Sequence, residues 1–263
     1  MTDVPTPHPE RPRYRLVADE LRRRILAKAI APSQLLPSET TLMNEFGVAR
    51  GTVREAIAVL RAEGLVVTEH GRGTYARPVL PIRRIGSDRY RREIEQLTGE
   101  NPPATSFIHD HATDWAAYQL DKDFREVPAT PAVAELFGVE PGTMLLERQF
   151  LFRIHGVPQQ LSTSCYPLTL VNGTPVADPD NEPWPGGNIA QLHSLGITAT
   201  RIREQVRARM PLEDEVQALR IPSGVPVLAV TRRTYAGDEV VEVAVDIVLP
   251  ADRTELEYDI PLQ

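Results

Sequence analysis

Apolar residues near the start of the chain recur at the spacing of an amphipathic helix. Tyr14, Val17, Leu21 and Ile25 follow one another at three- or four-residue steps, which places them on one helix face. The positions between them are mostly charged and rich in arginine. The pattern predicts a helix of about 15 residues, and the proline-rich residues 1–12 before it are expected to form a disordered arm.

Two shorter helices are predicted next, with only a short turn between them. Ser38 is a favourable N-cap residue for the first, and Gly47 suits the left-handed position just after its end. In the second helix, Val53, Ile57 and Leu60 form the apolar stripe. Two helices joined this tightly are typical of a helix-turn-helix.

A pair of β-prone runs follows at residues 65–78. They flank His70, Gly71, Arg72 and Gly73, which predicts a hairpin with a tight glycine turn. The Gly-x-Gly element is interpreted as this turn and not as a dinucleotide-binding loop, because no strand-to-helix crossover surrounds it. Three helices followed by a hairpin predict a winged helix-turn-helix.

The rest of the chain alternates between β-prone runs and short helical patterns. A short helix is expected just before Gly138 and another at residues 213–219. The expected strands are residues 143–154, 159–167, 202–210, 225–235 and 240–250. This arrangement predicts an α+β domain with a mainly antiparallel sheet.

Charge is distributed unevenly between the two halves of the chain. The 263 residues suffice for about two domains, and their net charge of −7 disfavours a phosphate backbone as partner of the chain as a whole. Residues 1–80 hold 12 Lys and Arg against 9 Asp and Glu, a net charge of +3. Residues 81–263 hold 17 against 27, a net charge of −10. A basic domain therefore precedes an acidic one.

The sequence also restricts the cellular compartment. No apolar run approaches the roughly 20 residues that span a membrane, and the N-terminus lacks the apolar core of a secretory signal. Cys165 is the only cysteine, so neither an intramolecular disulfide nor a Cys-rich zinc site can form. We expect a cytoplasmic protein.

Two arginines give the basic domain its candidate chemistry. Arg50 and Arg54 are four residues apart and share a helix face away from the apolar stripe, with Thr52 close by. The arginine fork can bond guanine O6 and N7 together, which discriminates by roughly 1 to 3 kcal/mol per base. A solvated helix face would carry the same residue types, so the pattern alone leaves both interpretations open.

Residues 36–78 closely resemble the DNA-binding domain of the GntR family of bacterial transcriptional regulators. The resemblance is carried by Leu36-Pro37-Ser38-Glu39, Gly47-Val48, Arg50, Thr52-Val53-Arg54, Glu63-Gly64-Leu65 and Gly71-Arg72-Gly73-Thr74. It implies that Arg50 and Arg54 read the major groove, with Thr40 and Thr52 in support and His70 and Gly71 at the wing tip. The predicted DNA contacts are Ser38, Thr40, Arg50, Gly51, Thr52, Arg54, His70, Gly71 and Arg72.

The family's first loop and recognition helix differ here in detail. Ala49 stands where the family usually has a Ser or Thr N-cap, so the third helix is expected to lack a cap worth about 1 kcal/mol. Ala29 and Ser33 replace customary glycines. None of these positions is a proposed base reader.

Residues 87–262 resemble the UTRA effector domain of the HutC subfamily, whose fold is similar to chorismate lyase. The resemblance is carried by short pieces in the expected order, namely Ala134-Glu135-Leu136, Gly138-Val139, Pro141-Gly142, Glu147-Arg148, Gly156-Val157-Pro158, Leu195-Gly196-Ile197, Ala218-Leu219, Ile221-Pro222, Arg232-Arg233 and Val241-Glu242. In that family a small molecule, often a sugar phosphate or a carboxylate, lies against the sheet.

The resemblance suggests five effector-binding residues. Arg148 is the candidate anion partner, Ser164 and Tyr166 are hydroxyl donors, Glu242 is a polar acceptor, and the Gly187 backbone opens a predicted helix. Arg148 as a surface or ion-paired arginine, and the glycines as an ordinary loop, remain open alternatives. Phe150 and Val248 replace an arginine and an aromatic hydroxyl common in relatives, so the effector is expected to be less anionic than a sugar phosphate.

Two further signals carry less weight. His109, Asp110, His111 and Asp114 resemble a metal cluster, but neighbouring polar loop residues often do, and we expect neither a metal nor a cofactor. Cys165 lies in an apolar strand without a nucleophile motif, so it is interpreted as a buried hydrophobic residue.

Together these observations predict a sequence-specific transcriptional regulator, expected to be a repressor. The predicted organisation is an arm (1–12), a winged helix-turn-helix (13–78), a linker (79–90) and an effector-binding and dimerisation domain (91–263). A homodimer would bind a partly palindromic operator, and a small-molecule effector would modulate that binding. The alternatives are an enzyme acting on a small organic acid through its lyase-like domain, and a DNA-binding structural protein without effector.

Overall fold

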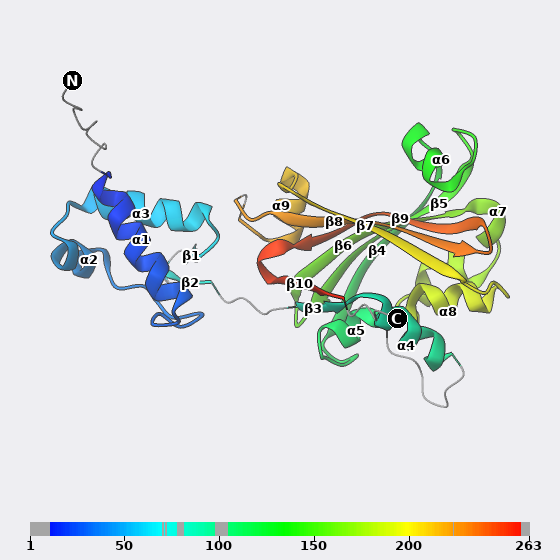
Figure 1. Ribbon diagram of the computed structural model, residues 1–263, viewed down its shortest axis with the longest axis horizontal. Coiled ribbons are helices and arrows are strands. Elements are labelled where there is room, and N and C mark those ends of the chain that lie inside the picture. Colours follow the sequence, from blue (N-terminus) through cyan, green and yellow to red (C-terminus); the bar gives the residue numbers. More distant parts are fainter. Residues whose placement is uncertain are drawn as a thin grey trace, which may run out of the picture. The chain divides into compact units, whose positions relative to one another are not determined.

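A computed structural model describes two compact units that divide near residue 80. The residues it describes are 11–69, 71, 73–77, 82–97, 105–222 and 224–258. The first unit is a helical bundle with a small hairpin, and the second is built around a β-sheet (Figure 1).

Three helices and a hairpin make up the N-terminal unit. The elements are α1 (Arg13–Leu26), α2 (Glu39–Phe46), α3 (Arg50–Ala62), β1 (Val66–Glu69) and β2 (Gly73–Ala76). The two strands pair antiparallel, with Val66 opposite Ala76 and Glu69 opposite Gly73, and Leu35 forms an isolated bridge with Tyr75. This is the predicted winged helix-turn-helix.

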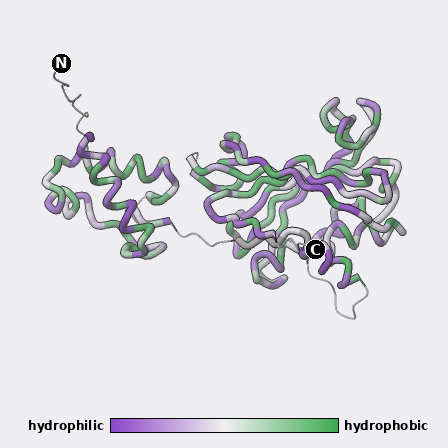
Figure 2. Tube along the Cα trace, in the orientation of Figure 1, coloured by the Kyte–Doolittle hydropathy of each residue, from purple (hydrophilic) through white to green (hydrophobic). Residues whose placement is uncertain are grey.

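The apolar stripes of the three helices meet in one core. Val17 and Leu21 of α1, Leu42 of α2, and Val53 and Leu60 of α3 are almost completely buried. Hydrophobic and hydrophilic stretches alternate within the helices, as the tube in Figure 2 shows. Burial of such side chains contributes roughly 1.5 to 3 kcal/mol each, so this core fixes which faces of α2 and α3 remain outside.

A six-stranded antiparallel sheet forms the centre of the second unit. The strand order is β4-β5-β6-β9-β8-β7. The strands are β4 (Tyr118–Pro128), β5 (Met144–Ile154), β6 (Val157–Pro167), β7 (Arg201–Arg209), β8 (Val227–Ala236) and β9 (Glu239–Pro250). Most residues of the central strand β9 are buried, because it has a neighbour on each side and a covering on both faces, whereas the edge strand β7 is largely exposed. The α+β architecture with a mainly antiparallel sheet is confirmed.

Short helices surround this sheet. They are α4 (Gly86–Gln96), α5 (Ser106–Asp110), α6 (Pro131–Phe137), α7 (Leu168–Val171), α8 (Gly187–Ser194), α9 (Glu213–Leu219) and the 3-10 turns η1 (Pro175–Ala177), η2 (Pro179–Asn181) and η3 (Ala251–Arg253). Helices α4, α5 and α8 gather on the same side of the sheet in Figure 1. Gly138 ends α6 in the left-handed conformation, with φ +74°, where a side chain would be strained.

Two parts of the fold differ from the sequence-based expectation. Residues 79–90, predicted to be a linker, include β3 (Ile82–Ile85) and the first turns of α4. Strand β3 pairs in parallel with β10 (Thr254–Glu257), so a distant segment satisfies its backbone hydrogen-bonding groups. Strand β4 was not predicted, because charged residues occupy many of its positions; as an edge strand it buries only alternate side chains in part.

Candidate nucleic-acid interface and ligand pocket

Helices α2 and α3 present two arginines on the surface of the N-terminal unit. Gly47 ends α2 in the left-handed conformation, with φ +60°, and α3 begins three residues later at Arg50. Because Val53 and Leu60 face the core, Arg50 and Arg54 lie on the outer face, with 63% and 64% of their side chains exposed. Both can therefore reach a partner molecule.

Glu39, in the first turn of α2, joins these two arginines. Arg50 Nε donates to Glu39 Oε2 at 2.6 Å, and Arg54 Nε donates to Oε1 at 3.0 Å. The hydrogen bond from Arg50, and then the one from Arg54, holds the pKa of the Glu39 carboxyl below its usual range. The sequence pattern assigns no function to Glu39, although it belongs to the Leu36-Pro37-Ser38-Glu39 motif. Only the packing of α2 against α3 brings its carboxylate to both arginines.

The other predicted contacts on these helices lie around the same two helix starts. Thr40 and Gly51 are exposed, and a Cβ on Gly51 would meet nothing within 4 Å. Thr52 is half-buried. Ser38 is exposed and also caps α2, since its Oγ accepts a hydrogen bond from Thr41 N at 3.1 Å.

The hairpin supplies part of the predicted wing. Gly71 is exposed and left-handed, with φ +78°, as a tight turn between paired strands requires. His70 and Arg72, the two predicted side-chain contacts of the wing, lie outside the described residues.

A polar cavity of about 110 Å³ lies between the sheet and the helices α4, α5 and α8 of the second unit. One part of its wall is aromatic and includes Phe107, Tyr118, Phe150, Phe152 and Trp184. Three arginines, Arg89, Arg148 and Arg232, and two carboxylates, Glu93 and Glu182, line the rest together with hydroxyl and amide side chains. Such a wall suits a small ligand with a flat apolar part and several hydrogen-bonding atoms.

Strand register places the sheet residues of this cavity in one row. Arg148 of β5 is opposite Ser164 of β6, Ser164 is opposite Ala244 of β9, and Ala244 is opposite Arg232 of β8. Directly opposite residues of an antiparallel sheet point to the same face. The two arginines therefore meet on one face of the sheet, although they lie far apart in the sequence.

Arg148 is held in place by the pocket itself. Its side chain is 3% exposed, Nη1 donates to Gln191 Oε1 at 2.9 Å, and Nε and Nη2 contact Ser164 Oγ at 3.3 and 3.2 Å. Its guanidinium lies 4.6 Å from the centre of the Tyr166 ring. The surface-arginine interpretation of Arg148 is therefore excluded, and Ser164 lines the cavity as its partner.

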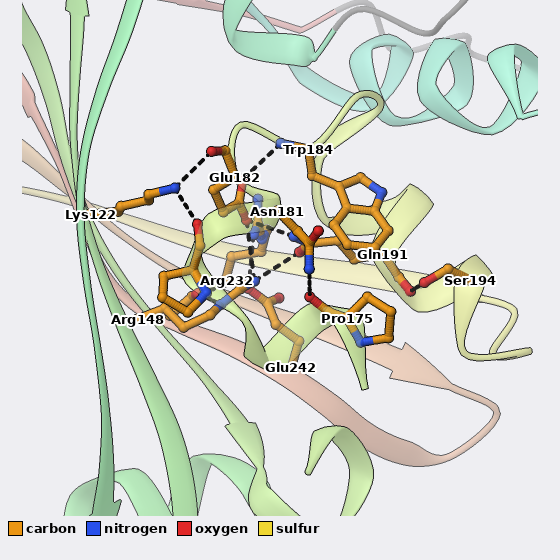
Figure 3. A network of polar contacts seen from close by, with 12 residues as sticks. Lys122, Arg148, Pro175, Asn181, Glu182, Trp184, Gln191, Ser194, Arg232 and Glu242 are labelled. Atoms are coloured by element: carbon orange, nitrogen blue, oxygen red, sulfur yellow. Dashed lines mark hydrogen bonds and ion pairs between the residues drawn. The ribbon is translucent and has the colours of Figure 1, made fainter. Parts of the chain in front are cut away.

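A loop segment after η2 closes one side of the cavity. Glu182 Oε1 lies 3.5 Å from Arg148 Nη1 and accepts a hydrogen bond from Gln191 Nε2 at 2.6 Å. Lys122 Nζ donates to the carbonyl oxygens of Pro179 and Glu182, so β4 holds this segment (Figure 3). Arg148 is thus paired with a carboxylate of the protein itself, as the ion-paired alternative expects.

Tyr166 and Glu242, both predicted effector contacts, lie behind the cavity and do not line it. Tyr166 is completely buried beneath Arg148, and burial raises the pKa of its phenol. Glu242 is also completely buried and accepts hydrogen bonds from Arg232 Nη2 at 2.9 Å and Thr234 Oγ1 at 2.8 Å. Each supports an arginine of the wall: the Tyr166 ring lies against the Arg148 guanidinium, and Glu242 lies beside Arg232 (Figure 3).

Gly187, a predicted effector contact, lines the cavity at the first residue of α8. Gly186 and Gly187 have φ values of +82° and +62°, which favour glycine. The following Asn188 also lines the cavity.

Several buried donors of the wall have no hydrogen-bond partner among the described residues. They are Arg89 Nε and Nη1, Arg232 Nε, Asn188 Nδ2 and the hydroxyl of Ser106. A buried donor without a partner costs about 1 to 3 kcal/mol, which a bound acceptor removes. Sequence reasoning did not assign Arg89 or Arg232 to the site: Arg89 falls in the predicted linker, and only the register of β8 directs Arg232 to the cavity.

The four residues whose sequence pattern resembles a metal site make other contacts in the structure. His109 contacts Gln96, Asp110 pairs with Arg89, His111 contacts the Phe107 carbonyl, and Asp114 accepts hydrogen bonds from two backbone amides. In the described part of the chain, no group of three or more His, Cys, Asp or Glu residues could hold a metal ion. Cys165 is buried, which raises the pKa of its thiol to about 12.

The fold and these two sites define a class of protein: a DNA-binding regulator with a separate ligand-binding domain. The chain belongs to the GntR family of bacterial regulatory proteins and carries a UTRA domain. The GntR model matches residues 13–76, and the UTRA model matches residues 122–255, half of the chain. Across the described residues, no helix is long and apolar enough to cross a membrane.

Relatives cover nearly the whole chain. The HTH-type transcriptional regulator SCO4628 of Streptomyces coelicolor is 29% identical over 91% of this chain and 89% of its own. The histidine utilization repressor of Klebsiella aerogenes is 24% identical over 94% and 93%. A crystal structure of a GntR-family transcriptional regulator, 33% identical, matches with a TM-score of 0.60 over 97% of this chain and 99% of that one. The chain is thus a transcriptional regulator, and the enzyme alternative is not supported.

Proposed function

We propose that this regulator represses transcription as a homodimer on a partly palindromic operator, and that a small acidic effector in the sheet cavity changes its DNA affinity. The DNA-binding part of this proposal rests on the two exposed arginines, Arg50 and Arg54, on the outer face of α3. Ser38, Thr40, Gly51 and Thr52 would support them, and His70, Gly71 and Arg72 would contact DNA from the wing.

Repression and dimerisation rest on different arguments. Relatives include the mannosyl-D-glycerate transport/metabolism system repressor of Escherichia coli and the repressor NagR of Bacillus subtilis. Two-fold symmetric helix-turn-helix dimers read two half-sites about one DNA turn apart. An operator with such half-sites would give each copy of α3 the same bases to contact. We expect the protein to act in the cytoplasm, where its DNA would be.

The chemistry of the cavity supports an acidic effector. Unpartnered donors of Arg89, Arg232 and Asn188 converge on it, and the aromatic wall favours a flat apolar part. Glu182 and Glu93 already supply negative charge, so a ligand with one carboxylate fits better than one with a doubly charged phosphate. Arg148, Ser164 and the Gly187 backbone would contact it, while Tyr166 and Glu242 would support the contacting arginines.

A footprint on the DNA upstream of the protein's own gene tests the DNA-binding proposal. Arg50→Ala and Arg54→Ala are each expected to lose roughly 5- to 100-fold in operator affinity and keep their fold. Arg125→Ala in the second domain is a matched control, since Arg125 is also 63% exposed and paired with a carboxylate. Footprints that match the wild type in both α3 variants would refute the assignment.

Thermal unfolding in the presence of small acids tests the effector proposal. Benzoate and other flat monocarboxylates are expected to raise the melting temperature, while their uncharged amides are not. Asn188→Ala should reduce the shift, because it removes a donor of the wall without leaving a buried charge unpaired. An equal shift for the amides, or for Asn188→Ala, would contradict an acid-binding role.

A further inference from the structure

Glu39 is placed to control how the two proposed base-reading arginines are presented. Its two carboxylate oxygens are each engaged by the Nε of a different arginine, at 2.6 Å for Arg50 and 3.0 Å for Arg54. The Glu39 side chain is only 28% exposed, whereas the arginines are more than twice as exposed. The carboxylate is thus more shielded from solvent than the two guanidinium groups that it joins.

The contacts through Nε leave the terminal nitrogens of both arginines available. Neither Arg50 nor Arg54 makes another hydrogen bond or ion pair with a described residue. The terminal pair of an arginine fork can bond guanine O6 and N7 end-on. A carboxylate that accepts a hydrogen bond only from Nε is therefore compatible with base recognition and does not have to be displaced.

The arrangement also restricts side-chain motion before DNA is bound. A free arginine side chain carries considerable rotamer entropy, part of which is lost on binding. One carboxylate tethers both side chains at once and separates two like charges on the same helix face. Its own charge lowers the attraction of this surface for any phosphate backbone, whatever the base sequence.

We propose that Glu39 is a positioning residue that raises sequence specificity: it orients the Arg50 and Arg54 forks toward bases and weakens binding to non-operator DNA. The proposal rests on the proposed role of the two arginines. It predicts opposite effects of Glu39 on the two kinds of DNA, which a purely structural role of the residue would not produce.

The test compares Glu39→Gln with the wild type in the full-length protein. Affinities are measured for the operator and for random DNA of equal length, at the same salt concentration. We expect Glu39→Gln to bind random DNA more tightly, because a negative charge is lost. We expect operator affinity to fall, so that the ratio of operator to random affinity drops roughly tenfold.

Glu45→Gln provides the matched control. Glu45 lies on the same helix α2 and also pairs with an arginine, Arg24, which is not a proposed base reader. The same loss of charge should strengthen binding to both DNAs alike and leave the ratio unchanged. Thermal unfolding of both variants checks that the domain remains folded.

A base-substitution scan of the operator completes the test. Glu39→Gln should lose discrimination only at the base pairs that Arg50→Ala and Arg54→Ala affect. If Glu39→Gln leaves the affinity ratio unchanged or raises it, Glu39 does not position the arginines and the inference is wrong. If both arginine variants bind the operator like the wild type, the proposed DNA contacts themselves are wrong, so the two failures are distinguishable.

Discussion

At the scale of single residues, buried charges define the ligand pocket. Glu242 is completely buried, the Arg232 side chain is 13% exposed, and the two are paired at 2.9 Å. Burial alone would lower the pKa of Arg232, but the charge of Glu242 raises it above its usual range. The arginine therefore stays charged, and its orientation depends on the carboxylate behind it.

Removing that carboxylate is expected to destabilise the second domain. Glu242→Gln leaves the Arg232 charge buried without its counter-ion, which costs roughly 3 to 5 kcal/mol in unfolding free energy. Asp121→Asn is the control: Asp121 is 62% exposed and pairs with Arg153, so its loss should cost less than about 1 kcal/mol. Urea denaturation measures both, and equal effects would contradict this account.

The buried imidazole of His111 is expected to make the folding stability of the protein depend on pH. Burial lowers the pKa of its imidazole to about 4, despite the contact with the Phe107 carbonyl, whereas in the unfolded chain the value is near 6.5. The unfolded state therefore binds the proton more readily, so stability is complete above pH 6.5 and falls as the pH drops toward 4.

The expected loss over that pH range is about 3 kcal/mol. It is measured by denaturant unfolding of the wild type and of His111→Phe at pH 7 and pH 4.5. The phenylalanine variant should lose less stability on acidification, because it has no imidazole to protonate. An identical pH dependence in both proteins would assign the acid sensitivity to other groups.

At the scale of elements, helix caps decide how firmly the proposed recognition helix begins. Ala49 is the N-cap of α3 and makes no side-chain hydrogen bond, as the sequence predicted, whereas Ser38 caps α2. Ala49→Ser should stabilise the N-terminal domain by about 1 kcal/mol, and Ser38→Ala should destabilise it by a similar amount. Thermal unfolding of the two variants checks both signs.

Elements with strong local signals were predicted correctly. Helices α2 and α6 carry side-chain caps and glycine ends that can be recognised within a few residues. Strand β3 was missed because a distant partner stabilises it: it is paired with β10 near the other end of the chain. Strand β4 was missed because its many charged residues obscure the alternation of apolar and polar positions that is typical of a half-buried strand.

At the scale of the whole molecule, the charge difference between the domains governs DNA binding. Residues 1–80 carry a net charge of +3, while residues 81–263 carry −10 and should contribute little attraction to phosphates. Operator affinity is expected to fall roughly 1,000-fold between 50 and 200 mM salt if a dimer makes about six phosphate contacts. Titrations at several salt concentrations measure the slope, and a nearly flat dependence would contradict phosphate neutralisation by this domain.

The sequence by itself determined the winged helix-turn-helix, the α+β class of the second domain and the family. These follow from periodicity, caps and turns, which depend on residues close together in the chain. Only the tertiary structure decided which side chains form the sites. The row that brings Arg148 and Arg232 together depends on the register of four strands, and the contact of Glu39 with Arg50 and Arg54 depends on the packing of two helices. Both are set by burial across the fold, which no short stretch of sequence specifies.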